Sequence, residues 1–127
     1  MDTHQHHQDI IDRVSEQLKD VLGSSEQGIY IYLDDVHKAC NKKFASLLGY
    51  ASPKEWAQTE GNFPDRFADH GSQEALVSAY GKAMERMVAS TIKISWKKKA
   101  GGTVETIVIL VPIEFEGHLL ALHFVTD

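Results

Sequence analysis

The sequence predicts an α+β domain in which helices cover one face of a single antiparallel β-sheet. Apolar residues recur with helical spacing through much of the first two thirds of the chain, where two short strands also occur. The last third contains three runs rich in β-branched and aromatic residues, joined by glycine turns. Because strands joined by tight turns pair as antiparallel neighbours, these runs form a meander. The length of 127 residues fits one domain with one core.

The composition excludes several classes of function. Hydrophobic residues make up 43% of the chain and charged residues 24%, which is typical of a globular domain. The net charge of -5 argues against binding to nucleic acid or to an anionic membrane, since both need a basic face. No stretch approaches the ~20 apolar residues of a membrane span, and no signal peptide is found. We therefore expect a cytoplasmic protein.

The N-terminal region divides into a polar tail and an amphipathic helix. Residues 1–8 predict a flexible tail. Its histidines are suited to transition metals, but no carboxylate or cysteine is tied to them by a folded frame, so no metal site is predicted. Residues 9–23 predict a helix whose apolar stripe has the spacing of a short heptad seam. The stripe either pairs two copies into a homodimer or docks on its own domain; it consists of Ile11, Val14, Leu18 and Val21.

Two short strands and two capped helices are expected next. Residues 27–35 alternate aliphatic residues with tyrosine before an Asp-Asp turn, and residues 36–40 form the second strand. Asn41 is expected to cap the following helix by accepting a hydrogen bond from a backbone N–H in its first turn. Ser52 is expected to cap the helix after that, because a proline and Glu55 complete a capping box.

The longest helix is expected over residues 72–90, with Ser72 as its N-cap. Its apolar stripe consists of Leu76, Tyr80, Ala83, Met84 and Met87. Three strands complete the sheet, over residues 91–99, 104–115 and 118–125.

In this order, residues 24–127 resemble the PAS domain family. The segment Gly28–Trp56 looks like the family's first two strands and its Asn-x-x-Phe…Leu-Gly-Tyr pattern, and Phe67–Leu76 is similar to its entry into the long helix. The closing strands resemble the family's last hairpins. The resemblance implies a PAS-like five-stranded antiparallel sheet, with short helices and one long helix on one face, preceded here by the N-terminal helix.

The family resemblance also implies a function. Members bind a small molecule or a protein partner and relay a conformational change, so we expect a sensory or regulatory domain that is not an enzyme. A homodimer through the N-terminal helix is implied, as is output through a signalling protein or an effector domain beyond residue 127. The candidate residues of the ligand cavity are Ile29, Ile31, Phe44, Phe67, Tyr80, Met84, Ile94, Trp96 and Ile109. Residues that line a cavity and residues that fill a core are of the same types, so these side chains are equally consistent with a core that leaves no cavity.

The sequence identifies no cofactor. Covalent flavin is disfavoured because Cys40 does not stand in the Asn-Cys-Arg-Phe motif of the light-oxygen-voltage subfamily, and a small buried side chain is expected there instead. Haem is disfavoured because the long helix has no histidine, and only His70 lies near it.

The alternative function is a small cavity-containing enzyme of the isomerase or dehydratase kind. Its acid–base pair would be His70 with Asp69, or His123 with Glu105. Against this alternative, the sequence has no nucleophile elbow, metal-binding motif or glycine-rich phosphate loop.

Overall fold

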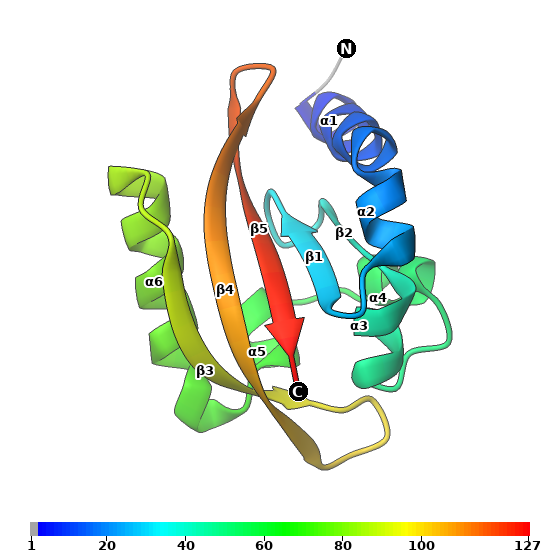
Figure 1. Ribbon diagram of the computed structural model, residues 1–127, viewed down its shortest axis with the longest axis vertical. Coiled ribbons are helices and arrows are strands. Elements are labelled where there is room, and N and C mark those ends of the chain that lie inside the picture. Colours follow the sequence, from blue (N-terminus) through cyan, green and yellow to red (C-terminus); the bar gives the residue numbers. More distant parts are fainter. Residues whose placement is uncertain (1–2) are drawn as a thin grey trace.

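The computed structural model describes residues 3–127 and contains a five-stranded antiparallel sheet (Figure 1). The strands lie in the order β2-β1-β5-β4-β3, so the first and last strands of the chain pair at the centre of the sheet. Their bounds are β1 (Gly28–Tyr32), β2 (Lys38–Cys40), β3 (Ser90–Lys97), β4 (Thr103–Phe115) and β5 (His118–Thr126). The predicted fold class is confirmed.

Helices lie on both faces of this sheet. The inner face is covered by α3 (Lys42–Leu47), α4 (Pro53–Gln58), α5 (Phe63–Phe67), the short turn η1 (His70–Ser72) and α6 (Gln73–Arg86). The outer face carries α1 (Thr3–Gln17), which continues as α2 (Lys19–Ser24). Within residues 3–127, no helix combines the length and the apolar character that crossing a membrane requires.

The N-terminal helix is longer than predicted and docks on its own domain. Residues 3–8, expected as a flexible tail, form the first turns of α1, while residues 1–2 lie outside the described part. Ile10, Ile11 and Val14 are buried against Ile31 and Leu120 of the outer sheet face. This packing holds the helix on the sheet, which extends the order back into the polar segment.

Most of the apolar stripe of this helix therefore packs against the protein's own sheet. Ile11 and Val14 are only 2% and 3% exposed, so neither is available as a dimer seam. Leu18 is partly buried in the same cluster, and Val21 alone of the four is exposed. Of the two roles considered for the stripe, a dimer seam or docking on its own domain, Ile11 and Val14 serve docking.

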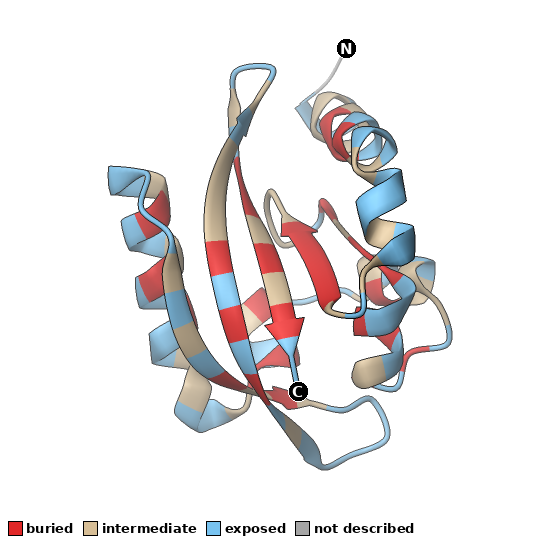
Figure 2. Cartoon of the chain, in the orientation of Figure 1, coloured by how far each residue is buried: buried red, intermediate tan, exposed pale blue. Residues whose placement is uncertain are grey.

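The inner face holds an aromatic core. Tyr30 of β1 lies among the rings of Phe44, Trp56, Phe63 and Trp96, with ring centroids 4.8 to 5.7 Å from its own. Burial alternates along β4, as Figure 2 shows by its banded colouring. The buried residues of that alternation face the helices.

Asn41 ties the start of α3 to the first strand. Its side-chain oxygen accepts hydrogen bonds from the backbone N–H of Phe44 and of Ile29, each at 2.9 Å. Its amide nitrogen donates to the carbonyl of Gln27 at 3.0 Å. The predicted cap is confirmed, and the same side chain, 4% exposed, also fixes where β1 begins.

The other two predicted caps have different outcomes. Ser52 accepts from the N–H of Glu55 at 3.1 Å, and the Glu55 carboxylate accepts from the N–H of Ala51, so this cap is confirmed. Ser72 does not cap α6. Its hydroxyl accepts from the N–H of Ser95 at 2.9 Å instead, because η1 brings it against the edge strand β3.

We predict that Asn41→Ala lowers the free energy of unfolding by about 3 kcal/mol, because it leaves two buried N–H groups and one part-buried carbonyl without their partner. The matched variant Ser52→Ala removes a partly exposed cap and should lower it by about 1 kcal/mol. Urea denaturation of both variants measures the difference. Equal losses would show that Asn41 acts only as a helix cap.

Candidate ligand-binding site

A pocket of about 210 Å³ lies between the inner sheet face and helices α5 and α6. Other hollows reach about 750 Å³, but that largest one lies outside this layer and is lined by surface side chains such as Lys54 and Glu60. The inner pocket is lined by Tyr30, Tyr32, Asp35, Asn62, Phe63, Pro64, Leu76, Val77, Tyr80 and His123.

Tyr30 and His123 are stacked against each other at this pocket. They are cross-strand partners on β1 and β5, and their rings are nearly parallel, with centroids 3.8 Å apart. Tyr30 is 0% and His123 2% exposed. Within the described part of the chain, neither the Tyr30 hydroxyl nor His123 Nδ1 has a hydrogen-bond partner. Each such buried group costs roughly 1–3 kcal/mol, which a suitable ligand would recover.

The stacked pair is uncharged at neutral pH. Burial lowers the pKa of the His123 imidazole to about 3, so the ring stays neutral. Burial also raises the pKa of the Tyr30 hydroxyl well above its ordinary value. Tyr30 and His123 therefore line the pocket as a neutral pair, and the Tyr30 hydroxyl and His123 Nδ1 are themselves buried.

A second aromatic pair, Tyr32 and Tyr80, forms the wall of the pocket towards α6. The rings of Tyr32 and Tyr80 meet edge to face, with centroids 5.2 Å apart. The Tyr32 hydroxyl donates to Asp35 Oδ1 at 2.7 Å, and the N–H of Phe63 donates to the same oxygen at 3.1 Å. Asp35 thus joins β1 to the start of α5. Burial, followed by this hydrogen bond, raises the pKa of Tyr32 far above its ordinary value.

Comparisons with known proteins identify this arrangement of sheet and helices. No family model matches the chain, and no curated protein matches it in sequence. Solved structures do match. A PAS domain from Colwellia psychrerythraea aligns over 90% of this chain and 96% of its own, with a TM-score of 0.69 and 21% identity. The chain has the PAS fold.

Two further structures support that assignment. A PAS domain from a two-component sensor histidine kinase covers 91% of this chain and 97% of its own, with a TM-score of 0.67 and 10% identity. The PAS domain of an HTR-like protein from Haloarcula marismortui covers 97% and 98%, with a TM-score of 0.64 and 17% identity. At these identities the likeness concerns the fold, so the function of this domain must be argued from its own residues.

The structure separates the sequence-predicted cavity residues into three groups. Tyr80 lines the pocket. Four others are buried in the aromatic core beside it, and Met84 packs partly buried between α6 and the sheet. Those four are Phe44, Phe67, Ile94 and Trp96. Trp96 was expected to line the cavity, but it is buried in the core, where its indole N–H donates to the Thr106 hydroxyl at 2.9 Å.

The remaining three predicted residues lie on the wrong face. Ile31 packs under α1, Ile29 shares its parity on β1, and Ile109 is 40% exposed on the outer side of β4. The sequence analysis chose the wrong face of β1 as the pocket side, because both faces of this strand carry apolar side chains. Ile31 packs against α1, whereas Tyr30 and Tyr32 line the pocket. Period-two alternation indicates a strand without showing which side faces the ligand.

Sequence reasoning missed Tyr30, Tyr32 and Asp35, and it named His123 only as a candidate acid–base residue with Glu105. A signal was present, since a tyrosine buries a ring but also needs a partner for its hydroxyl. Two tyrosines on one face of β1 were therefore better candidates for a polar pocket than the isoleucines between them.

Neither of the two acid–base pairs considered in the sequence analysis lies together in this pocket. Glu105 is exposed on the outer parity of β4, whereas His123 is buried on the inner face. His70 is exposed on η1, away from the residues that line the pocket. Cys40 is buried, and burial raises the pKa of its thiol to about 12, so the side chain stays protonated.

We predict that His123 makes the domain acid-sensitive. An unfolded histidine titrates near about pH 6.5, whereas folded His123 resists protonation until about pH 3. Below pH 6.5 the unfolded state therefore binds more protons, and stability falls with falling pH. His123→Phe keeps a ring against Tyr30 but cannot titrate. Between about pH 7 and pH 4.5, wild type should lose about 2 kcal/mol more than this variant in urea denaturation. Parallel pH profiles would contradict the prediction.

Proposed function

We propose that this PAS domain is a sensory module that binds a small molecule in the Tyr30–His123 pocket and relays the change to a signalling partner, without catalysis. The observation that carries the proposal is the pair of buried polar atoms, the Tyr30 hydroxyl and His123 Nδ1, left unpaired at a pocket of ligand size. The kinase origin of one PAS neighbour supports a signalling role.

The pocket favours a neutral ligand with one aromatic ring and a hydrogen-bonding substituent. An apolar cavity of about 150 Å³ accepts benzene, and drug-sized ligands need about 300 Å³ or more, so a volume of about 210 Å³ falls between. The walls are mainly aromatic and aliphatic, which suits a ring. The lining residues include no lysine or arginine, and the one carboxylate, Asp35, is already bonded to Tyr32 and Phe63.

The relay would pass through the loop between β1 and β2. Asp35 lies at the pocket, and its carbonyl accepts a hydrogen bond from Lys38 Nζ at 2.8 Å. The same ammonium group donates to the carbonyls of Ala57 and Thr59 at the end of α4. A ligand that moves Tyr32 or Asp35 therefore acts on a buried cation that holds the loop to α4.

The expected partners are a second copy of the chain and a cytoplasmic signalling protein. Because Ile11 and Val14 are buried, we propose that a partner binds instead to the part of the outer sheet face that α1 leaves uncovered. Apolar side chains remain exposed there on β4, namely Ile107 and Ile109.

We predict that a panel of neutral monocyclic aromatic compounds will yield a binder in native mass spectrometry, and that Tyr30→Phe will weaken it about 10-fold. Loss of one hydrogen bond accounts for that factor. The matched variant Tyr50→Phe alters a buried tyrosine that does not line the pocket and should bind like wild type. A panel without any binder, or equal affinity of Tyr30→Phe and wild type, would contradict the proposal.

A further inference from the structure

Histidines that are far apart in sequence gather at one end of the outer face. His4, His6 and His7 project from the first turns of α1, His37 follows the turn after β1, and His118 begins β5. The ring centroids of His4 and His37 are 4.6 Å apart, and those of His6 and His118 are 4.9 Å apart. The helical start of α1 thus supplies the folded frame that the sequence alone did not reveal.

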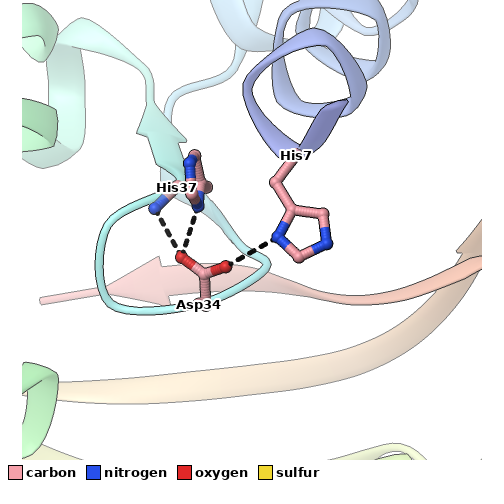
Figure 3. A group of neighbouring side chains, drawn as sticks. All are labelled: His7, Asp34 and His37. Carbon is pink, nitrogen blue, oxygen red and sulfur yellow. Dashed lines mark hydrogen bonds and ion pairs between the residues drawn. The ribbon is translucent and has the colours of Figure 1, made fainter. Parts of the chain in front are cut away.

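A carboxylate lies within this cluster. Figure 3 shows Asp34 between two imidazoles: its Oδ2 is 3.2 Å from His7 Nδ1, and its Oδ1 is 2.7 Å from His37 Nδ1. One ligand atom from each of these three residues lies within 4.8 Å of the others. A tetrahedral zinc ion with bonds of about 2.0–2.1 Å holds its ligand atoms roughly 3.3–3.4 Å apart. Small side-chain rotations would bring the three groups to that spacing.

Hydrogen bonds already orient the side chains of Asp34 and His37. Asp34 Oδ1 also accepts from the backbone N–H of Val36 at 3.0 Å and of His37 at 2.8 Å, so the carboxylate is fixed by its own loop. His37 is 5% exposed, and its Nε2 lies 2.8 Å from His4 Nδ1, a contact that fixes the ring orientation. Asp34 and His7 stay partly exposed, which leaves a route for an ion from solvent.

We propose that His7, Asp34 and His37 bind one divalent transition metal ion of the zinc type. Two imidazoles and a carboxylate form a nitrogen–oxygen set that suits zinc and its neighbours, whereas calcium and magnesium prefer oxygen ligands alone. The partly exposed side of the site leaves the fourth position to a water molecule.

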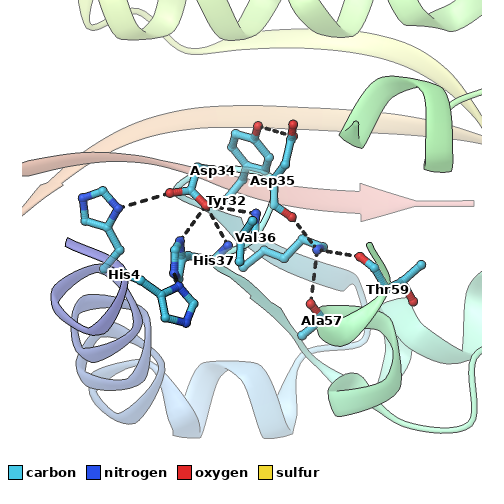
Figure 4. A network of polar contacts seen from close by, with 10 residues as sticks. His4, Tyr32, Asp34, Asp35, Val36, His37, Ala57 and Thr59 are labelled. Carbon is cyan, nitrogen blue, oxygen red and sulfur yellow. Dashed lines mark hydrogen bonds and ion pairs between the residues drawn. The ribbon is translucent and has the colours of Figure 1, made fainter. Parts of the chain in front are cut away.

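Metal binding would fasten the first turns of α1 to the loop between β1 and β2. This loop also carries Asp35, which accepts a hydrogen bond from Tyr32 at the end of β1 (Figure 4), and both residues line the pocket. The ion would therefore clamp the helix to the segment that borders the ligand pocket. The metal site is independent of the proposed ligand, because its residues do not line that pocket.

Zinc and cobalt titrations of the full chain, stripped of metal by a chelator, test this proposal. We expect one saturable site by calorimetry, a cobalt absorption spectrum of nitrogen–oxygen coordination, and a Tm rise of about 5–10 °C at saturating zinc. Asp34→Asn keeps the oxygen that accepts from Val36 and His37 but removes the charge, and His7→Gln removes a ring that is not fully buried. Each should weaken zinc binding at least about 10-fold.

Matched controls isolate the site. His70→Gln and Asp20→Asn make the same substitutions at exposed positions outside the cluster and should bind zinc like wild type. The Tm of each variant in chelator shows that its fold is retained. A wild-type titration without saturable binding overturns the proposal. Undiminished affinity of Asp34→Asn also overturns it, since the histidines of α1 would then bind the ion without the loop.

Discussion

The pairing of β1 with β5 is the constraint on which the other features depend. It joins the first strand to the last, and it places Tyr30 directly opposite His123 at the centre of the sheet. A slip of β1 by one residue would turn Tyr30 towards α1 while His123 stayed on the pocket side, so the stacked pair would be lost. The pocket, its uncharged polar pair and the aromatic core around Tyr30 all follow from that single register.

The loop between β1 and β2 serves both faces of the sheet because consecutive side chains diverge. Asp35 bonds Tyr32 and Phe63 at the pocket, whereas Asp34 lies against His7 and His37 beside α1. The turn is closed by hydrogen bonds to Asp34 and is held to α4 by Lys38. The buried ammonium of Lys38 donates to three carbonyls and so links this loop to the end of α4.

Sequence reasoning succeeded where the determinants are local. The caps at Asn41 and Ser52 act within one helical turn, and the strands follow from short runs, so the PAS-like order was predictable. It failed where the outcome depends on distant packing. The face of β1 that meets the pocket is set by where α1 docks, and both faces are apolar. The histidine cluster also escaped prediction, because His7 and His37 come together only after that docking.

The central claim is that a small molecule binds in the pocket and forms hydrogen bonds with Tyr30 and His123. The most direct measurement is a crystal structure of the protein purified from its own cells without added compounds. We expect density for a single-ring molecule in the pocket, with polar atoms about 2.7–3.2 Å from the Tyr30 hydroxyl and His123 Nδ1. A pocket filled by protein side chains that bond both atoms would contradict the claim.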